Sequence, residues 1–278
     1  MGIVIRSNPT AKATLSSLER TQRKLSGNML KLSSGMRINS AKDDAAGLAI
    51  SESLKAQVVS LQQANRNSSD AVSTLQIAEA AMGEVATTLT RMRELAMQSS
   101  SGQLSNQQRG FLDQEMEELR NEVTRISQVT EFNGLALLDG SLSTGTGTLS
   151  FQVGIENTNN DRINVNIATV SATGLGIGTM SLSSQTRARS ALDTIDSAIN
   201  SLSSSRATLG AKMNRLTITM DNLASAEQNI SAANSRIRDV DVGAEMGKMV
   251  SNQILSQAGS AMLSQANSLP QIALGLIG

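Results

Sequence analysis

The feature that most constrains this chain is a long stretch in which apolar residues recur at alternating intervals of three and four. The stretch begins at Leu192, ends at Ile237, and carries polar residues at the same spacing only at Arg206, Glu227 and Asn234. Residues at this spacing share one side of an α-helix, and a sustained seven-residue repeat is typical of helices that coil around one another. At about 1.5 Å per residue, such a helix would run roughly 70 Å. The stretch therefore predicts a long helix that packs against other helices.

Packing has to supply free energy that this helix lacks by itself. Burial of its apolar residues could contribute very roughly 15 to 30 kcal/mol at most, whereas ordering the backbone costs about 1 to 2 kcal/mol per residue. We therefore expect a mainly α fold built on a long, antiparallel, coiled-coil-like helical rod. The residues predicted to form the central rod seam are Leu209, Met213, Leu216, Met220 and Leu223.

The first half of the chain repeats the helical spacing in three further segments. The run from 39 to 47 ends the first segment, and Asp43 and Asp44 are suited to cap a second helix over about 45–99. A third helix is expected over about 105–129. The predicted seam of the first segment is Leu15, Leu18, Leu25, Met29, Leu32 and Met36, with Gln22 as its polar member.

Between residues 132 and 186 the apolar spacing changes from helical to alternating. The polar run 156–162 separates two alternating segments and is typical of a turn. We predict a small β-hairpin followed by a loop rich in Gly, Ser and Thr. The alternating residues are Leu149, Phe151, Val153 and Ile155 in one segment and Ile163, Val165 and Ile167 in the other.

A break near residues 238–243 separates the long helix from a last amphipathic helix. This helix is predicted to run from about Ala244 to Ser268 and to end before Pro270, because proline interrupts helical hydrogen bonding. The two terminal segments are similar in length, so we expect them to pair with each other. The apolar face of the last helix, which we interpret as an assembly surface, is Val250, Ile254, Leu255, Met262 and Leu269.

Composition excludes several classes of function. The 278 residues include 24 basic and 24 acidic residues, no His, no Cys, no Trp and no Tyr. The balance of charge argues against binding to nucleic acid or to anionic membranes. Without His or Cys there is no imidazole or thiol catalysis, and no zinc or iron–sulfur site that depends on those ligands. We predict no catalytic, cofactor-binding or metal site and no membrane insertion, and composition alone suggests a soluble, intracellular protein.

Three motifs have both a functional and a structural interpretation. The glycine-rich run 174–178 has the wrong spacing for a phosphate-binding loop, so we interpret it as a plain loop. The acid pairs at 43–44 and 239–241 lie at helix breaks, where capping is favoured over cation binding. Arg91, Leu95 and Glu115 could form a recognition patch, but on the residues alone solvated charges beside a packed leucine are favoured.

The chain resembles the bacterial flagellins. The N-terminal motif is LSSGMRINSAKDDAAGLAIS at 32–51, followed by RMRELAMQ at 91–98, TEFNG at 130–134 and FQVG at 151–154. The C-terminal motifs are ANSRIRDVD at 233–241 and QILSQAGSAMLSQAN at 253–267. The resemblance covers nearly the whole chain, and the chain lacks the bulky variable outer domains of large flagellins. It is similar to a minimal flagellin.

The resemblance implies a structural subunit that polymerises with itself into the flagellar filament. The implied domains are 1–44 and 237–278, which pair in the inner tube, and 45–236, the outer-tube rod with its hairpin and outward loop at about 132–186. It also implies an extracellular location reached by export without cleavage of a signal peptide. The implied partners are the filament cap, the junction proteins, the export apparatus and a chaperone on the C-terminal helix.

Two further implications bear on particular residues and on the alternatives. In the flagellin family, Arg91, Leu95 and Glu115 match a patch that contacts neighbouring subunits and the vertebrate Toll-like flagellin receptor, which favours the functional interpretation of that patch. A hook–filament junction protein of the same architecture is the closest alternative. An extracellular enzyme on a helical scaffold is a more distant one, because the zinc motifs of protease-bearing flagellins need His.

Overall fold

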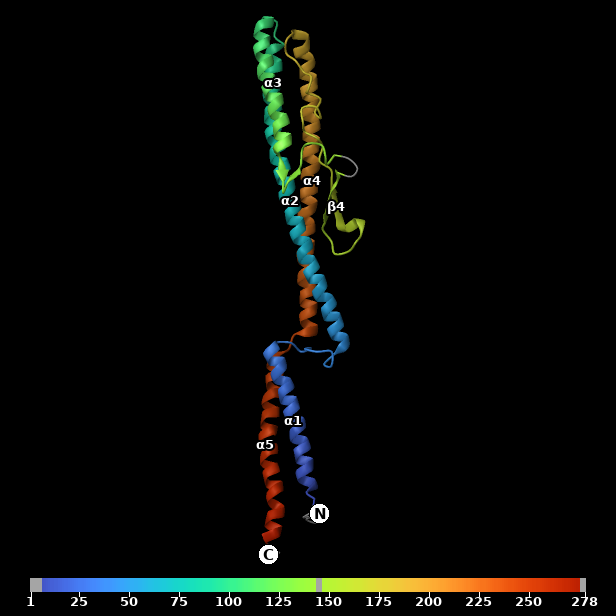
Figure 1. Cartoon of the computed structure of the whole chain (residues 1–278), viewed down its shortest axis with the longest axis vertical. Helices are drawn as coiled ribbons and strands as arrows, with labels where there is room; N and C mark the ends of the chain where they lie inside the picture. Colours follow the sequence, from blue (N-terminus) through green and yellow to red (C-terminus); the bar gives the residue numbers. More distant parts are fainter. Residues whose placement is uncertain (1–6, 144–146, 276–278) are drawn as a thin grey trace. The chain divides into compact units, whose positions relative to one another are not determined.

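The computed structural model describes residues 7–143 and 147–275, and its described part is dominated by long helices (Figure 1). They are α1 (Pro9–Ser34), α2 (Ala45–Ser99), α3 (Asn106–Val129), α4 (Gln185–Arg238) and α5 (Val242–Gly275). Residues 58–228 form one compact unit, and the residues before 58 and after 228 form the other. The predicted class, a mainly α rod with a small β insert, is confirmed.

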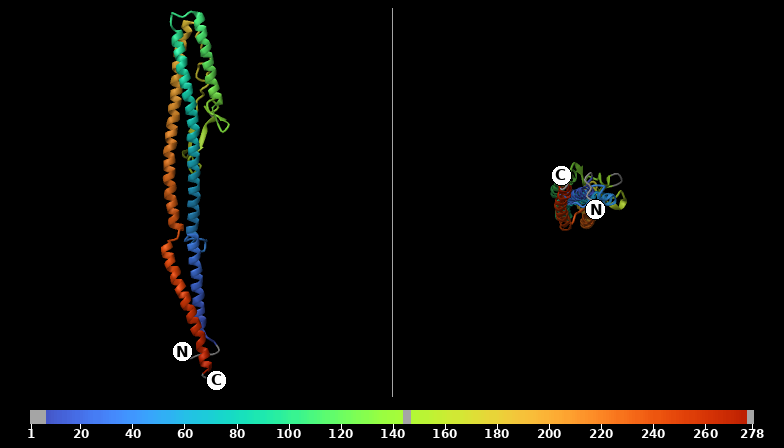
Figure 2. Two further views of the ribbon diagram at one scale, coloured as in Figure 1. Left: turned by 90° about the vertical axis from the view of Figure 1, so that its left-hand side faces the viewer. Right: turned by 90° about the horizontal axis from the view of Figure 1, so that it is seen from below.

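The core of the 58–228 unit lies between α2 and α4, which run side by side in Figures 1 and 2. Arg93 pairs with Asp196 at 2.6 Å, and Glu79 pairs with Arg206, so α4 runs antiparallel to α2. On α2 the buried residues recur at alternating intervals of three and four: Leu61, Ala64, Ser68, Ala71, Leu75, Ala78, Met82, Val85, Leu89, Met92, Ala96 and Ser99. On α4, large apolar residues of the same core are buried at every seventh position: Ile195, Leu202, Leu209, Leu216 and Leu223.

The turn from α2 to α3 is held by a buried arginine. Arg109 is 5 % exposed, and its guanidinium donates to the carbonyl oxygens of Ser99, Ser101 and Leu104 at 2.6 to 2.9 Å. These carbonyls lie at and just beyond the end of α2, where helical partners run out and a positive charge is favoured. The Ser105 hydroxyl caps α3, with the Gln108 side chain returning a hydrogen bond to the Ser105 N–H.

Two short antiparallel pairs of strands make up the β insert. β1 (Glu131–Phe132) pairs with β2 (Leu135–Ala136), and β3 (Leu149–Gln152) pairs with β4 (Arg162–Val165). β3 is shorter than predicted, since the N–H groups of Val153 and Gly154 both donate to the carbonyl oxygen of Asp161 and so interrupt the regular ladder. Val153 is therefore buried beyond the strand, and Ile155 is 43 % exposed in the turn.

The segment after β4 packs on the helices of the same unit. The Asp113 carboxylate of α3 accepts hydrogen bonds from the Leu182 N–H at 2.6 Å and from the Ser181 hydroxyl at 3.0 Å. Ile177 and Leu182 are fully buried in the core. Part of this loop therefore contributes to the core of the unit, and its outward position in the filament stays a prediction.

Asp residues cap the helices on both sides of the predicted breaks. The Asp44 carboxylate accepts from the Gly47 N–H at 2.8 Å in the first turn of α2, and that of Asp241 accepts from the Ala244 N–H at 3.0 Å in the first turn of α5. Asp43 accepts from the N–H groups of Asn39 and Ser40. The structural interpretation of these acids as caps and turn formers is confirmed.

The boundary predicted for the last helix is wrong. α5 begins at Val242 and continues through Pro270 to Gly275. Proline has no N–H, so the carbonyl of Ala266, four residues earlier, loses its helical donor. The side chain of Asn8, the cap residue of α1, donates to that carbonyl at 2.8 Å. An outside donor thus satisfies the oxygen that the proline leaves without a partner.

Candidate assembly surfaces

α1 and α5 lie side by side (Figures 1 and 2), and their contact residues also recur at intervals of three and four. The contacts run in opposite directions along the two helices, since Asn28 meets Asn252 whereas Asn8 meets Ala266. On α1 the covered residues are Ala11, Thr14, Leu18, Thr21, Leu25, Asn28 and Leu32, and on α5 they are Glu245, Met249, Asn252, Ser256, Gly259, Leu263 and Ala266. The seam is thus made largely of small and polar residues.

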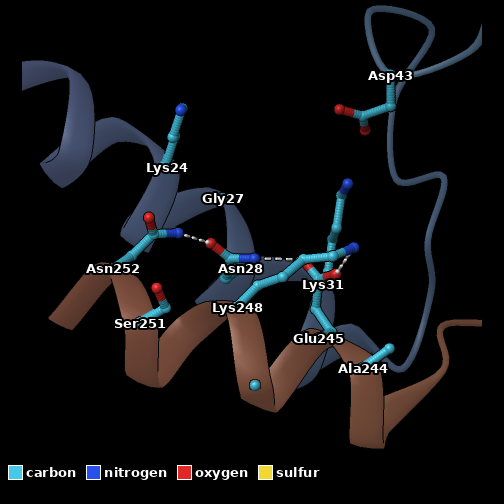
Figure 3. Close-up of a pocket in the computed structure, with 11 residues that line it drawn as sticks. Lys24, Gly27, Asn28, Lys31, Asp43, Ala244, Glu245, Lys248, Ser251 and Asn252 are labelled. Carbon is cyan, nitrogen blue, oxygen red and sulfur yellow. Dashed lines mark hydrogen bonds and ion pairs between the residues drawn. The ribbon is translucent and has the colours of Figure 1, made fainter. Parts of the chain in front are cut away.

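A hydrogen-bonded polar cluster occupies the most buried part of this seam (Figure 3). The Asn28 amide donates to the Glu245 carboxylate and accepts from the Asn252 amide at 2.9 Å. Lys248 donates to the other Glu245 oxygen at 3.0 Å, and this hydrogen bond is the main reason that the pKa of Glu245 is lowered. Within the described part of α1 and α5, only Asn28 and Glu245 are buried. A satisfied polar group at a seam position fixes the register of two helices better than it stabilises them.

Several large apolar side chains of α5 lie outside its seam with α1. Val250, Ile254, Leu255 and Met262 are 47 to 64 % exposed. The side chain of Leu269, the fifth residue of the predicted assembly surface, lies outside the described residues. A row of large exposed apolar side chains along one helix is a feature of interaction surfaces rather than of a finished monomer surface.

The predicted seam of α1 is correct in one half and wrong in the other. Leu18, Leu25 and Leu32 face α5 as predicted, but Leu15 and Met29 are 45 and 57 % exposed. Their places are taken by the residues one position earlier, among them Thr14 and Asn28. The helix is rotated because polar residues on α5, such as Asn252, bond to these polar residues of α1.

In the rod seam predicted on α4, the three leucines and the two methionines differ in burial. Leu209, Leu216 and Leu223 are 0 to 8 % exposed, whereas Met213 and Met220 are half-buried. All five lie on the side of α4 that faces the interior of the 58–228 unit.

The predicted receptor patch separates into a surface pair and a core residue. The Arg91 guanidinium bonds to the Glu115 carboxylate of α3 at 2.7 and 3.0 Å and also pairs with Glu94. These charges are exposed, and the hydrogen bond that Arg91 donates to Glu115 is the first cause of the raised pKa of Arg91. Leu95 is 1 % exposed, because α2 is covered by both α3 and α4 at this level. Leu95 thus lies on the packed face of α2, as the structural interpretation of the motif expected, and the receptor role of Arg91 and Glu115 stays a prediction.

Within the described ranges 7–143 and 147–275, no group of three His, Cys, Asp or Glu side chains could hold a metal ion. None of the helices there is long and apolar enough to cross a membrane.

Family profiles match both ends of the chain. The profile described as "Bacterial flagellin N-terminal helical region" matches residues 5–143, and "Bacterial flagellin C-terminal helical region" matches residues 192–277. The chain is also similar to the flagellin of Halalkalibacterium halodurans, with 44 % identity over 90 % of each chain. The chain belongs to the bacterial flagellin family.

Two further relatives bear on the kind of flagellar protein. The flagellar filament 33 kDa core protein of Treponema phagedenis is 38 % identical over 99 % of this chain and 100 % of its own length. A putative flagellar hook-associated protein of Vibrio parahaemolyticus has a similar structure, with a TM-score of 0.58, covering 71 % of this chain and all of that one. At 15 % identity this last similarity shows the fold alone, so the junction-protein alternative is not favoured.

Membership of this family establishes the coarse function. The protein is a structural subunit, not an enzyme, and polymerises with copies of itself into the extracellular flagellar filament. The residues that sequence reasoning missed are Asn28, Glu245 and Asn252 in the α1–α5 seam and Arg109 in the 58–228 unit. The missed signal in α1 was a stripe of Thr and Asn at helical spacing beside the leucines.

Proposed function

We propose that α1 and α5 line the inner tube of the filament and that the apolar row of α5 contacts neighbouring copies there. In this proposal residues 1–44 and 237–278 form the inner-tube domain, and 45–236 form the outer-tube rod. The observation that carries it is the exposure of Val250, Ile254, Leu255 and Met262, all turned away from α1. These side chains lose their contact with water only when another chain covers them.

Deletion of residues 244–278 tests this assignment. The truncated chain keeps the α2–α4 core, so we expect a soluble, helical monomer with the melting transition of the 58–228 unit intact. It should fail to extend filament seeds, which sedimentation measures. Elongation of seeds by the truncated chain would contradict the inner-tube assignment.

The α1–α5 pair is also proposed to become firmly ordered only on assembly. Its seam is small and polar, and an isolated helix of this length is marginal in water. Hydrogen exchange should be fast in residues 9–34 and 242–268 of the monomer and slow in the filament. Equal protection in the two states would reject this part of the proposal.

We propose that the partners of export and assembly bind the same exposed row of α5. Before assembly, a chaperone that covers the apolar row of α5 would keep the chain monomeric, and the cap and junction proteins would meet the same surface at the filament ends. Binding of the family's chaperone should be lost on deletion of 244–278. Export without cleavage predicts that the filament protein keeps residues 2–8, which mass spectrometry measures.

A further inference from the structure

A groove of about 790 Å³ opens beside the Asn28–Glu245 cluster, within the unit that α1 and α5 form (Figure 3). Its walls come from α1, from the start of α5 and from the loop that carries Asp43. The polar cluster forms one side, so the groove is not an apolar surface of the kind formed by the exposed row of α5.

Two glycines in the groove have no explanation within the chain. Gly27 and Gly247 lie inside α1 and α5, where glycine destabilises a helix relative to alanine. A Cβ built on either one meets no atom of the described chain within 4 Å. Close approach of another molecule is one physical reason for a glycine at such a position.

The charges around the groove are unbalanced. Lys24, Lys31 and Lys248 line it, and Figure 3 shows Lys24 and Lys31 extending from α1 to the same side. Within the described ranges neither Lys24 nor Lys31 makes an ion pair, and the two carboxylates of the groove are already occupied. Asp43 accepts from backbone N–H groups, and Glu245 is bonded to Asn28 and Lys248. The charge of Lys31 also acts on Asp43 and Glu245, but the ammonium groups of Lys24 and Lys31 have no ion pair within the described residues and can receive an incoming anion.

The same imbalance divides the whole chain, although its net charge is zero. The unit of residues 1–57 and 229–278 contains 12 basic and 7 acidic residues, and residues 58–228 contain 12 basic and 17 acidic ones. One unit therefore carries five excess positive charges and the other five excess negative charges. In a polymer of identical chains, such units attract each other between copies.

We infer that the groove between α1 and α5 receives a carboxylate from the 58–228 unit of a second copy, held by Lys24 and Lys31 above the two glycines. The occupant is a copy of this chain because the protein polymerises with itself and because its other unit supplies the excess of acid. Of the carboxylates in the described part of the basic unit, only Glu19 has no hydrogen-bond or ion-pair partner. The basic unit therefore has few unpartnered carboxylates to offer the groove of another copy.

Charge-neutralising variants of the full chain test the proposal. Lys24→Ala with Lys31→Ala should raise the critical concentration for seeded polymerisation about tenfold, since charge pairs that lose water at an interface are costly to break. The matched control, Lys12→Ala with Lys55→Ala, removes the same charge from the same unit outside the groove and should change it less than about twofold. Equal effects of the two pairs would reject a specific role for the groove.

Further measurements identify the occupant. Filaments made from mixed isotope-labelled and unlabelled chains, treated with a carbodiimide that joins amines to carboxylates, should give intermolecular crosslinks from Lys24 or Lys31 to acids between 58 and 228. Crosslinks only to acids of the basic unit would overturn the proposal. So would polymerisation of Gly27→Leu at the wild-type critical concentration, with circular dichroism as the check on its fold.

An anionic lipid is the competing occupant. If the groove variant polymerises like wild type and instead loses binding to phosphatidylglycerol vesicles, the lysines serve a lipid headgroup and the proposal fails.

Discussion

The seam between α2 and α4 and the seam between α1 and α5 share one spacing but are filled differently. Along α2 the buried positions hold either large apolar side chains or alanine and serine, and the buried positions of α4 include Ile195 and a series of leucines. Between α1 and α5 the corresponding positions mix a few Leu and Met with Ala, Thr, Asn, Ser, Gly and Glu, and most are only half-buried. Equal periodicity therefore does not mean equal stability. The first seam can hold a monomer together, whereas the second specifies a pairing and leaves apolar surface for neighbours.

The largest expected effect comes from introducing a charge into the rod seam and, for comparison, on the exposed face of α5. Leu216→Asp puts a carboxylate at a fully buried position of α4, which should cost about 4 kcal/mol or more and unfold the rod. Leu255→Asp on α5, where the side chain is 55 % exposed, should leave the monomer's melting temperature unchanged and abolish polymerisation. Circular dichroism and sedimentation measure the two effects. An unchanged melting temperature for Leu216→Asp would contradict the rod seam.

A second prediction concerns a double substitution that makes the α1–α5 seam apolar, like the seam of the rod. Asn28→Leu combined with Glu245→Leu replaces a buried polar contact with apolar packing and should stabilise the α1–α5 pair by about 1 to 4 kcal/mol. Asn252 is half-buried and can bond to water instead. Slower hydrogen exchange over residues 9–34 in the monomer is the expected result. Unchanged or faster exchange would mean that the polar cluster is the stronger arrangement.

These two seams also show what sequence periodicity can and cannot predict. The α4 leucines were predictable because apolar residues define their stripe without competition. On α1, two stripes one residue apart were available, and the apolar one containing Leu15 and Met29 was chosen. The actual stripe, with Thr14 and Asn28, depends on hydrogen bonds to α5, and a partner far away in sequence is not encoded in local spacing.

The same limit applies to the surroundings of Leu95 in the rod and to the end of α5. Leu95 is buried because α3 covers α2 on a side that the α4 seam does not, and the periodicity of α2 cannot show a second neighbour. Pro270 was expected to end α5, but Asn8 supplies a donor to the carbonyl of Ala266. Arg109 gave no signal because its partners are backbone carbonyls.

A third prediction concerns pH and the α1–α5 seam. The pKa of Glu245 is lowered from its ordinary 4.5, first by the hydrogen bond from Lys248 and then by that from Asn28, with Lys31 also nearby. A lowered folded-state pKa means that the stabilisation is complete above pH 4.5 and is lost as the pH falls through the folded-state value. Acid should therefore speed hydrogen exchange in α1 and α5, and Glu245→Gln should remove that part of the pH dependence. The same acid response in Glu245→Gln would place the responsible group elsewhere.

The smallest expected effect on stability concerns the surface of the rod rather than either seam. Arg91 pairs with Glu94 and Glu115, and all three side chains are exposed, so Arg91→Ala should leave the melting temperature of the monomer essentially unchanged. If Arg91 and Glu115 form a receptor surface, the same substitution should weaken signalling through the vertebrate Toll-like flagellin receptor, because arginine at the centre of an interface is a common anchor. Leu95→Ala is not an equivalent test, since it would open a cavity in the core. Lys212→Ala, at another cation of the rod, is the control for loss of charge. Wild-type signalling by a folded Arg91→Ala monomer would assign Arg91 to subunit contacts or to a solvated ion pair.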